Sequence, residues 1–255
     1  MSSGSATVDD IVALAKAANE DPTPLPDINT LGDTPQHIRD LLARLHKLSV
    51  DQEKNITPES FKGVPFDTFM QDKFIALEED KCLFVYSLLR STNATTIVEA
   101  GTSYGVSTIY LALAAAANAA AAGASSSSGK KARVVATEHE PTKATQARAY
   151  WDECGPAVSD VIDLRVGDLR ETLKTDLENV DFLLLDIWTP MALPTLKVVH
   201  PKMRRGAVVI TDNTQSAAKP YRELLTYLRD PANGFVNVVL PYKGGLEMSI
   251  YQPAN

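Results

Sequence analysis

The stretch Thr95-Thr-Ile-Val-Glu-Ala-Gly-Thr-Ser-Tyr-Gly-Val-Ser-Thr108 decides how this chain folds. It begins as an apolar strand, passes through a turn that contains Gly101 and Gly105, and continues into an alanine-rich helix. Such a unit points backbone N–H groups at a ligand, and its glycines let the main chain come close. The spacing is E-x-G-x-x-x-G, whereas a dinucleotide site needs G-x-G-x-x-G. A plain βα turn without a ligand is the alternative.

From this stretch onward, strands and helices alternate, which is typical of a parallel sheet covered by helices on both faces. Two further β-rich runs near the C-terminus are joined by Lys243-Gly-Gly and predict an antiparallel hairpin at one edge. We therefore expect a Rossmann-like α/β domain with a seven-stranded, mostly parallel sheet. The expected strands are 95–100, 133–138, 161–166, 180–186, 206–212, 235–242 and 246–252.

The region before the first strand is predicted to be helical. One helix starts at Thr34-Pro35, an N-cap and first-turn pair, and a second is expected over 71–90. Residues 1–33 form a predicted extension with a short helix at 8–19 and a Pro-rich linker at 21–26. We therefore predict an extension (1–33) followed by a single domain (34–255). The domain consists of N-terminal helices (34–94) and a sheet core (95–255).

Composition narrows the possible functions. The chain has 255 residues, of which 44% are hydrophobic, so it can bury one large core. Its net charge of −7 argues against a nucleic-acid partner. The two cysteines indicate reduced thiols, no apolar run approaches the roughly 20 residues of a membrane span, and the N-terminus lacks a secretory signal. We expect a cytoplasmic protein with a small-molecule partner and no membrane partner; a homodimer is left open.

Oxygen-bearing side chains stand at the carboxyl ends of the predicted strands, where ligands bind in open α/β sheets. Carboxylates gathered on one rim repel each other unless a cation or a hydroxyl-bearing ligand lies among them. The rim is therefore the candidate site. Its members are Glu99, Glu138, Asp168, Asp186, Asp212 and Asn213.

Three members of the rim suit a hard metal ion. Asp186, Asp212 and Asn213 follow neighbouring strands, and their oxygens are the ligands that Mg²⁺ or Mn²⁺ prefers. The alternative is that Asp212-Asn213 forms a turn and Asp186 caps a helix. Glu138 is placed to accept ribose hydroxyls, with a helix cap or a solvated acid as its alternative. His139 follows Glu138 and is the candidate general base by position.

Together these features resemble the cation-dependent small-molecule O-methyltransferases, whose familiar members act on catechols and caffeoyl thioesters. The resemblance covers about residues 70–252 and is carried by 98–107, 138, 180–188, 206–213 and 245–251. It implies a class I methyltransferase fold, S-adenosylmethionine as cofactor, and Mg²⁺ or Mn²⁺ on Asp186, Asp212 and Asn213. The implied cofactor contacts are Glu99, Gly101, Ser103, Tyr104, Gly105, Ser107, Glu138, His139, Asp168, Asp186 and Trp188.

Two departures from the family pattern qualify the implied reaction. The family has a lysine three residues after its first metal aspartate, and this chain has Thr189, which cannot act as a base at neutral pH. The glutamate that binds substrate in the catechol branch aligns with apolar Val238. We expect metal-assisted O-methylation of a small hydroxylated acceptor, with Asp186 and His139 as the catalytic residues. The alternatives are a metal-independent enzyme, a different acceptor atom, or a cofactor binder without turnover; an NAD oxidoreductase is disfavoured by the glycine spacing.

Overall fold

The computed structural model describes residues 6–19, 28–63, 65–123 and 131–254 of the chain. The chain divides into two compact units, Met1–Gly32 and Asp33–Asn255. In the first unit, the expected short helix is α1 (Val8–Asn19), and its N-terminus is capped by mutual bonds between Thr7 and Asp10. The predicted linker at 21–26 lies outside the described residues.

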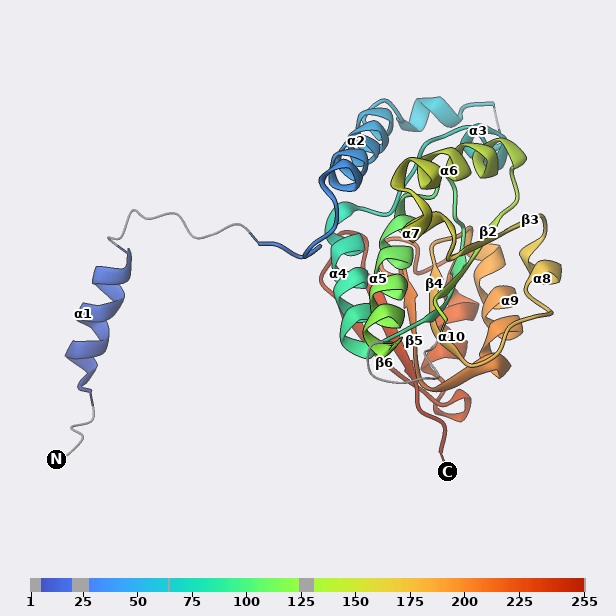
Figure 1. The fold of residues 1–255 in the computed structure, drawn as a ribbon. Coiled ribbons are helices and arrows are strands. Elements are labelled where there is room, and N and C mark those ends of the chain that lie inside the picture. The colour runs from blue at the N-terminus through green and yellow to red at the C-terminus, as the bar shows by residue number, and fades with distance from the viewer. Residues whose placement is uncertain (1–5, 20–27, 64, 124–130, 255) are drawn as a thin grey trace. The chain divides into compact units, whose positions relative to one another are not determined.

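The second unit is built on a seven-stranded sheet in the order β3-β2-β1-β4-β5-β7-β6 (Figure 1). The first five strands in sequence pair in parallel, and β7 pairs antiparallel with both β5 and β6. The predicted fold class is confirmed, including the antiparallel hairpin. The strands are β1 (Thr96–Ala100), β2 (Arg133–Glu138), β3 (Ile162–Val166), β4 (Val180–Leu185), β5 (Met203–Thr211), β6 (Phe235–Leu240) and β7 (Leu246–Tyr251).

Helices cover the sheet on both faces (Figure 1). On one face α5 packs on β1 and β2, with α4 and α7 beside it; on the other α9 packs on β4, with α8 and α10 beside it. The α2 helix packs against α5 and α6. The helices are α2 (Gln36–Glu53), α3 (Phe66–Met70), α4 (Glu79–Thr92), α5 (Val106–Gly123), α6 (Pro141–Cys154), α7 (Pro156–Ser159), α8 (Leu169–Thr172), α9 (Thr189–Val199) and α10 (Arg222–Arg229), with 3₁₀ turns at Pro58–Phe61, His200–Lys202 and Pro231–Asn233.

Both faces of the central strands are apolar because both are covered. Ile97 and Val98 are neighbours on β1, point to opposite faces, and are both fully buried. Among the described residues, α5 is the one helix that is long and apolar enough to cross a membrane by composition, and 56% of it is buried inside the protein. This burial is what a core helix of an α/β domain shows.

The second predicted helix was placed too early. Residues 71–78 are not helical, and α4 begins only at Glu79. The backbone N–H groups of Phe74 and Ala76 bond to side chains of α2 instead of to helical carbonyls, the first to Gln52 and the second to Ser49 at 3.0 Å. This segment therefore packs its apolar residues as an extended connection along α2.

Smaller boundary errors have local causes. The fifth strand begins at Met203, ahead of the expected residue 206, and its register against β4 shifts between Val180 and Phe182. Pro35 occupies the N-cap position of α2, which the prediction gave to Thr34. The hairpin loop spans 241–245, longer than Lys243-Gly-Gly, because β6 ends at Leu240.

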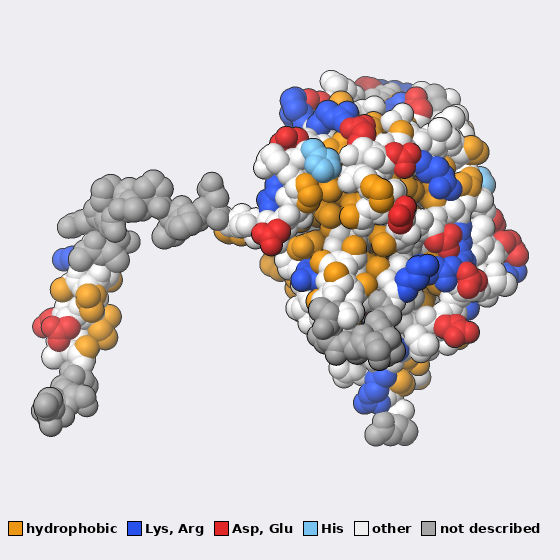
Figure 2. All heavy atoms as spheres, in the orientation of Figure 1, with side chains coloured by type: hydrophobic (Ala, Val, Ile, Leu, Met, Phe, Trp, Pro, Cys, Tyr) orange, Lys and Arg blue, Asp and Glu red, His pale blue; other side chains and the backbone are white. Residues whose placement is uncertain are grey.

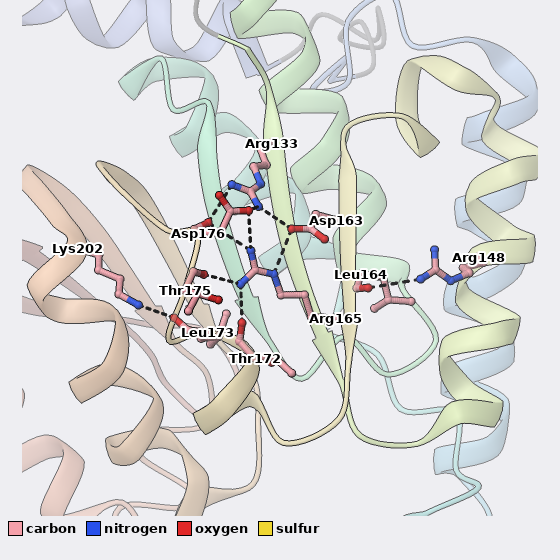
Figure 3. A network of polar contacts seen from close by, with 10 residues as sticks. All are labelled: Arg133, Arg148, Asp163, Leu164, Arg165, Thr172, Leu173, Thr175, Asp176 and Lys202. Atoms are coloured by element: carbon pink, nitrogen blue, oxygen red, sulfur yellow. Dashed lines mark hydrogen bonds and ion pairs between the residues drawn. The ribbon is translucent and has the colours of Figure 1, made fainter.

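Ion pairs close the edge of the sheet opposite to the strand carboxyl ends. Figure 3 shows Arg133 and Arg165, from β2 and β3, sharing the carboxylates of Asp163 and Asp176. On the face of the second unit drawn in Figure 2, hydrophobic side chains gather in the middle, and charged side chains of both signs lie around them. The drawn face therefore carries no single-sign charged patch.

Asp181, at the start of β4, ties this strand to β1. Its Oδ2 accepts bonds from the backbone N–H groups of Thr95 at 2.8 Å and Thr96 at 2.9 Å, and its Oδ1 pairs with Arg204. Burial alone would raise the pKa of Asp181, but the bonds from Arg204 and the two N–H groups hold it below its usual value.

We expect Asp181→Ala to lower the free energy of unfolding by about 2–3 kcal/mol at neutral pH, because two buried amides lose their acceptor. A depressed pKa in the folded state stabilises the protein above the unfolded value of about 3.9, and the effect is lost as the pH falls through the folded pKa. Urea denaturation at pH 7 and near pH 3 measures both effects. Exposed Asp160→Ala is the control, and an equal loss at both pH values would contradict the assignment.

Candidate active site

The sheet reverses its strand order between β1 and β4, so their carboxyl ends define the crevice in which such folds bind ligands. Ala100, Glu138, Leu185 and Thr211 end four parallel strands at this edge. The structure places most of the predicted site residues directly after these strand ends. Asp168 follows the outermost strand, β3.

The two glycines of the turn are fixed by contacts within the protein. Gly101 has φ of +94°, and an added Cβ would lie 2.1 Å from the carbonyl oxygen of Asp186. Gly105 has φ of +79°, and an added Cβ would lie 2.5 Å from Nε1 of Trp151, which donates a hydrogen bond to the Gly105 carbonyl at 3.0 Å. The glycines therefore set the shape of the turn by letting two neighbours approach its backbone.

Glu138 holds the middle of the same turn. Its Oε2 accepts a bond from the backbone N–H of Ser103 at 2.7 Å, and Ser103 has φ of +50°. Its Oε1 accepts bonds from the N–H groups of His139 and Glu140, each at 2.8 Å. A carboxylate offers about four acceptor positions, so one position remains for a ligand hydroxyl. The sequence prediction gave Glu138 both ribose hydroxyls.

Glu99 lies behind the turn and supports it from inside. Its side chain is fully buried and accepts hydrogen bonds from the hydroxyls of Ser107 at 2.6 Å, Thr102 at 2.8 Å and Thr108 at 2.5 Å. Burial raises the pKa of Glu99, and the three hydroxyl bonds oppose that rise. Since Ser107 turns its hydroxyl toward Glu99, both residues support the turn from inside, and their predicted contact with the cofactor stays a prediction.

Two aromatic side chains stand on the rim. Tyr104 stacks on Phe74 with ring centroids 4.5 Å apart, and its hydroxyl donates to the Asp72 carbonyl at 3.2 Å. The loop before α4 is thereby attached to the glycine turn. Trp188 is the residue before α9, and its side chain is 43% exposed on the rim.

Two predicted site residues lie away from the centre. Asp168 caps α8 through the N–H of Arg170 at 2.9 Å and pairs with the Arg170 guanidinium, which lowers the pKa of Asp168 to about 2. His139 is exposed at the end of β2. Since β1 separates β2 from β4, the backbone at His139 is roughly 10 Å from the backbone at Asp186 by strand spacing. The structure therefore does not bring His139 to Asp186, and Asp168 has a structural role.

The acidic pair that sequence analysis singled out does come together. Asp186 and Asp212 follow the adjacent strands β4 and β5, and the backbone N–H of Asp212 donates to the Leu185 carbonyl at 3.1 Å. Burial and the charge of Asp212 raise the pKa of the Asp186 carboxyl well above its usual value. Asp186 is partly exposed, whereas Asp212 is 3% exposed.

A lysine that the sequence analysis missed enters this pair from α4. Lys81 is fully buried, and its Nζ lies 2.6 Å from Oδ1 of Asp212 and 2.8 Å from Oε2 of Glu78. Burial lowers the pKa of Lys81, but the bonds to Asp212 and Glu78 outweigh it and raise the pKa above its usual value. The sequence did carry a signal: Leu77, Lys81, Val85 and Leu89 recur every four residues, so the lysine stands on a buried helical stripe.

The contacts of Asp212 and Asn213 do not fit the predicted Mg²⁺ or Mn²⁺ site. Asp212 gives one oxygen to Lys81 and the other to the Asn213 amide, whose Nδ2 donates at 2.6 Å. The Asn213 carbonyl oxygen accepts from the Ser216 hydroxyl at 3.2 Å. Two of the three expected metal ligands are therefore engaged by protein donors. Within the part of the chain that the structure describes, no three His, Cys, Asp or Glu side chains are arranged to hold a metal ion.

The strand order, the glycine turn at the switch point and the acid at the end of β2 define the class I methyltransferase fold. Solved structures share this fold. Cofactor-bound Rv0187 from MTB has a TM-score of 0.63 at 21% identity, covering 98% of this chain and 100% of that one. SAH-bound methyltransferase PaMTH1 from Podospora anserina has a TM-score of 0.62 at 12% identity, covering 99% and 100%. At these identities the likeness concerns the fold.

Sequence comparison extends the likeness beyond the fold. Residues 98–214 match the family described as a methyltransferase domain. Catechol O-methyltransferase from Mycobacterium tuberculosis is 29% identical over 140 residues, which is 54% of this chain and 57% of that protein. The chain thus spans somewhat more than half the length of this curated relative. These matches confirm the predicted resemblance to small-molecule O-methyltransferases.

Because the space beside Gly101 is filled by the backbone of Asp186, we expect Gly101→Val to destabilise the protein even without ligand. The expected loss is about 3 kcal/mol or more in the free energy of unfolding, measured by urea denaturation. Gly123→Ala is the control, because an added Cβ there meets nothing within 4 Å. A Gly101→Val protein as stable as the parent would show that this contact does not constrain the turn.

Proposed function

We propose that this protein is an S-adenosylmethionine-dependent O-methyltransferase that acts on a small hydroxylated acceptor, phenolic or catechol-like. The observation that supports the proposal most is the turn at Ser103, held in a left-handed conformation by Glu138 at the switch point of the sheet. A nucleoside hydroxyl can take the remaining acceptor position on Glu138, and the indole of Trp188 offers a surface for the adenine.

The acceptor is proposed to lie on the side of the crevice where Asp186 is partly exposed. In the reaction, the acceptor oxygen attacks the methyl carbon of the sulfonium in line. The new C–O bond forms as the S–C bond breaks, S-adenosylhomocysteine leaves, and the hydroxyl proton goes to a base. Asp186 is the carboxylate best placed for that proton, because both oxygens of Asp212 have partners. The protein contributes mainly position and electrostatic stabilisation.

The divalent metal expected from the family resemblance is not used in any step, because Lys81 and Asn213 already engage Asp212. Thr189, where the family has a lysine, is consistent with a second candidate: a protein that binds the cofactor without turnover. Cofactor binding without methyl transfer to any phenolic acceptor would favour this candidate.

The proposal also includes the cellular compartment and the binding partners of the protein. Cys82 and Cys154 are buried thiols, which is compatible with the reducing cytoplasm. The predicted partner remains a small molecule, and the homodimer left open by the sequence stays a prediction.

Glu138→Gln should weaken binding of S-adenosylhomocysteine by about tenfold or more, because a charged acceptor at the turn is lost. Isothermal calorimetry with the purified protein measures this change. The matched control is Glu223→Gln on the exposed side of α10, which should bind like the parent. Equal affinity in the Glu138 variant, or binding of NAD by the parent, would contradict the proposed cofactor site.

Asp186→Asn should reduce methyl transfer to a catechol panel by about 10²–10⁴-fold, the usual worth of a general base. Binding of S-adenosylhomocysteine should change much less, because the backbone of the turn is preserved. Thr189→Lys should raise the turnover of simple catechols by adding a basic nitrogen at the start of α9. Undiminished turnover in the Asp186 variant would remove this residue from the catalytic role.

A further inference from the structure

We propose that the ammonium group of Lys81 is the resident cation of this active site, in the place where the family resemblance expects a divalent metal ion. Methyl transfer by this protein then requires no metal. The inference builds on the proposed function only for its consequence in catalysis. The identity of the cation can be tested without any turnover.

The first support is the position of the ammonium group. Lys81 comes from α4, far from β5 in the sequence, yet its Nζ is 2.6 Å from Oδ1 of Asp212. The side chain is fully buried, and a second carboxylate, that of the N-cap residue Glu78 just before α4, lies 2.8 Å from Nζ. A fully buried lysine is rare unless it is paired, and here both partners are acidic.

The second support is the balance of charge. Asp186, Asp212 and Glu78 bring three carboxylates to one place, and Lys81 supplies a positive charge among them. A divalent ion on Asp212 would have to displace Nζ from Oδ1 or share that oxygen with it. Two cations a few ångströms apart in a buried site repel strongly, so ammonium and metal ion exclude each other.

The third support comes from the engagement of the neighbouring amide. Asn213 turns its Nδ2 toward Asp212 and its oxygen toward Ser216, so it behaves as a hydrogen-bond donor to the acid. With Lys81 and Asn213 both donating, each carboxylate oxygen of Asp212 has a donor from the protein. Lys81 has no exposed surface, so it is a positioning residue that acts on the acceptor through the acidic pair.

The test is a titration of the 255-residue protein with Mn²⁺, in which the electron paramagnetic resonance signal of free Mn²⁺ measures how much ion is bound. The parent should show no binding at the pair. Lys81→Met and Lys81→Gln remove the charge, so they should bind Mn²⁺ at least about tenfold more tightly than the parent, and Asp212→Asn in the same background should abolish the gain. Lys202→Gln is the matched control, because the Lys202 ammonium group donates to the carbonyls of Leu173 and Lys174 and not to a carboxylate among the described residues.

Two results would overturn the inference. One is tight Mn²⁺ binding by the parent that Asp212→Asn removes. The other is a Lys81 variant that still binds S-adenosylhomocysteine, and is therefore folded, but gains no affinity for Mn²⁺. If both Lys81 variants fail to fold, the parent titration decides alone: binding overturns the inference and its absence at millimolar Mn²⁺ supports it. If the parent protein does not bind S-adenosylhomocysteine, that result counts against the proposed function and not against the inference about Lys81.

Discussion

The close approach of Gly101 to the backbone of Asp186 is the constraint on which the rest of this site depends. The two strands that flank the switch point can lie together only because no side chain stands between them. This contact places the glycine turn directly beside the acidic pair, Asp186 and Asp212, so the proposed methyl donor and acceptor share one crevice. Glu99 holds the turn from the inside by accepting hydrogen bonds from three hydroxyl groups. Glu138 holds it from the rim by accepting a bond from the backbone N–H of Ser103.

Much of this arrangement could be predicted because it depends on local patterns. Apolar strands, glycine turns and a C-terminal hairpin have short-range signatures, and they led to the correct sheet. The rim residues could not be sorted by role in this way. Glu99 and Glu138 both end strands, but only the packing of α5 shows that Glu99 faces inward to Ser107 and Thr108.

The errors came from long-range contacts. The helix expected from residue 71 starts at Glu79, because side chains of α2 capture the backbone of the preceding segment. Lys81 joins Asp212 across 131 positions of sequence, a distance that no motif spans. The metal site was inferred from two carboxylates and one carboxamide at neighbouring strand ends, and from the family resemblance. What the three-dimensional structure adds is the basic group that already satisfies one of them.

The contact between Trp151 and the carbonyl of Gly105 has an optical consequence. The chain contains two tryptophans, and one touches the glycine turn from beneath while the other, Trp188, stands exposed on the same rim. The two indoles are expected to emit at different wavelengths, because Trp151 is buried and Trp188 is in contact with solvent. A ligand that binds in the proposed crevice would therefore change the surroundings of an indole, and we expect it to change the intrinsic fluorescence of the protein.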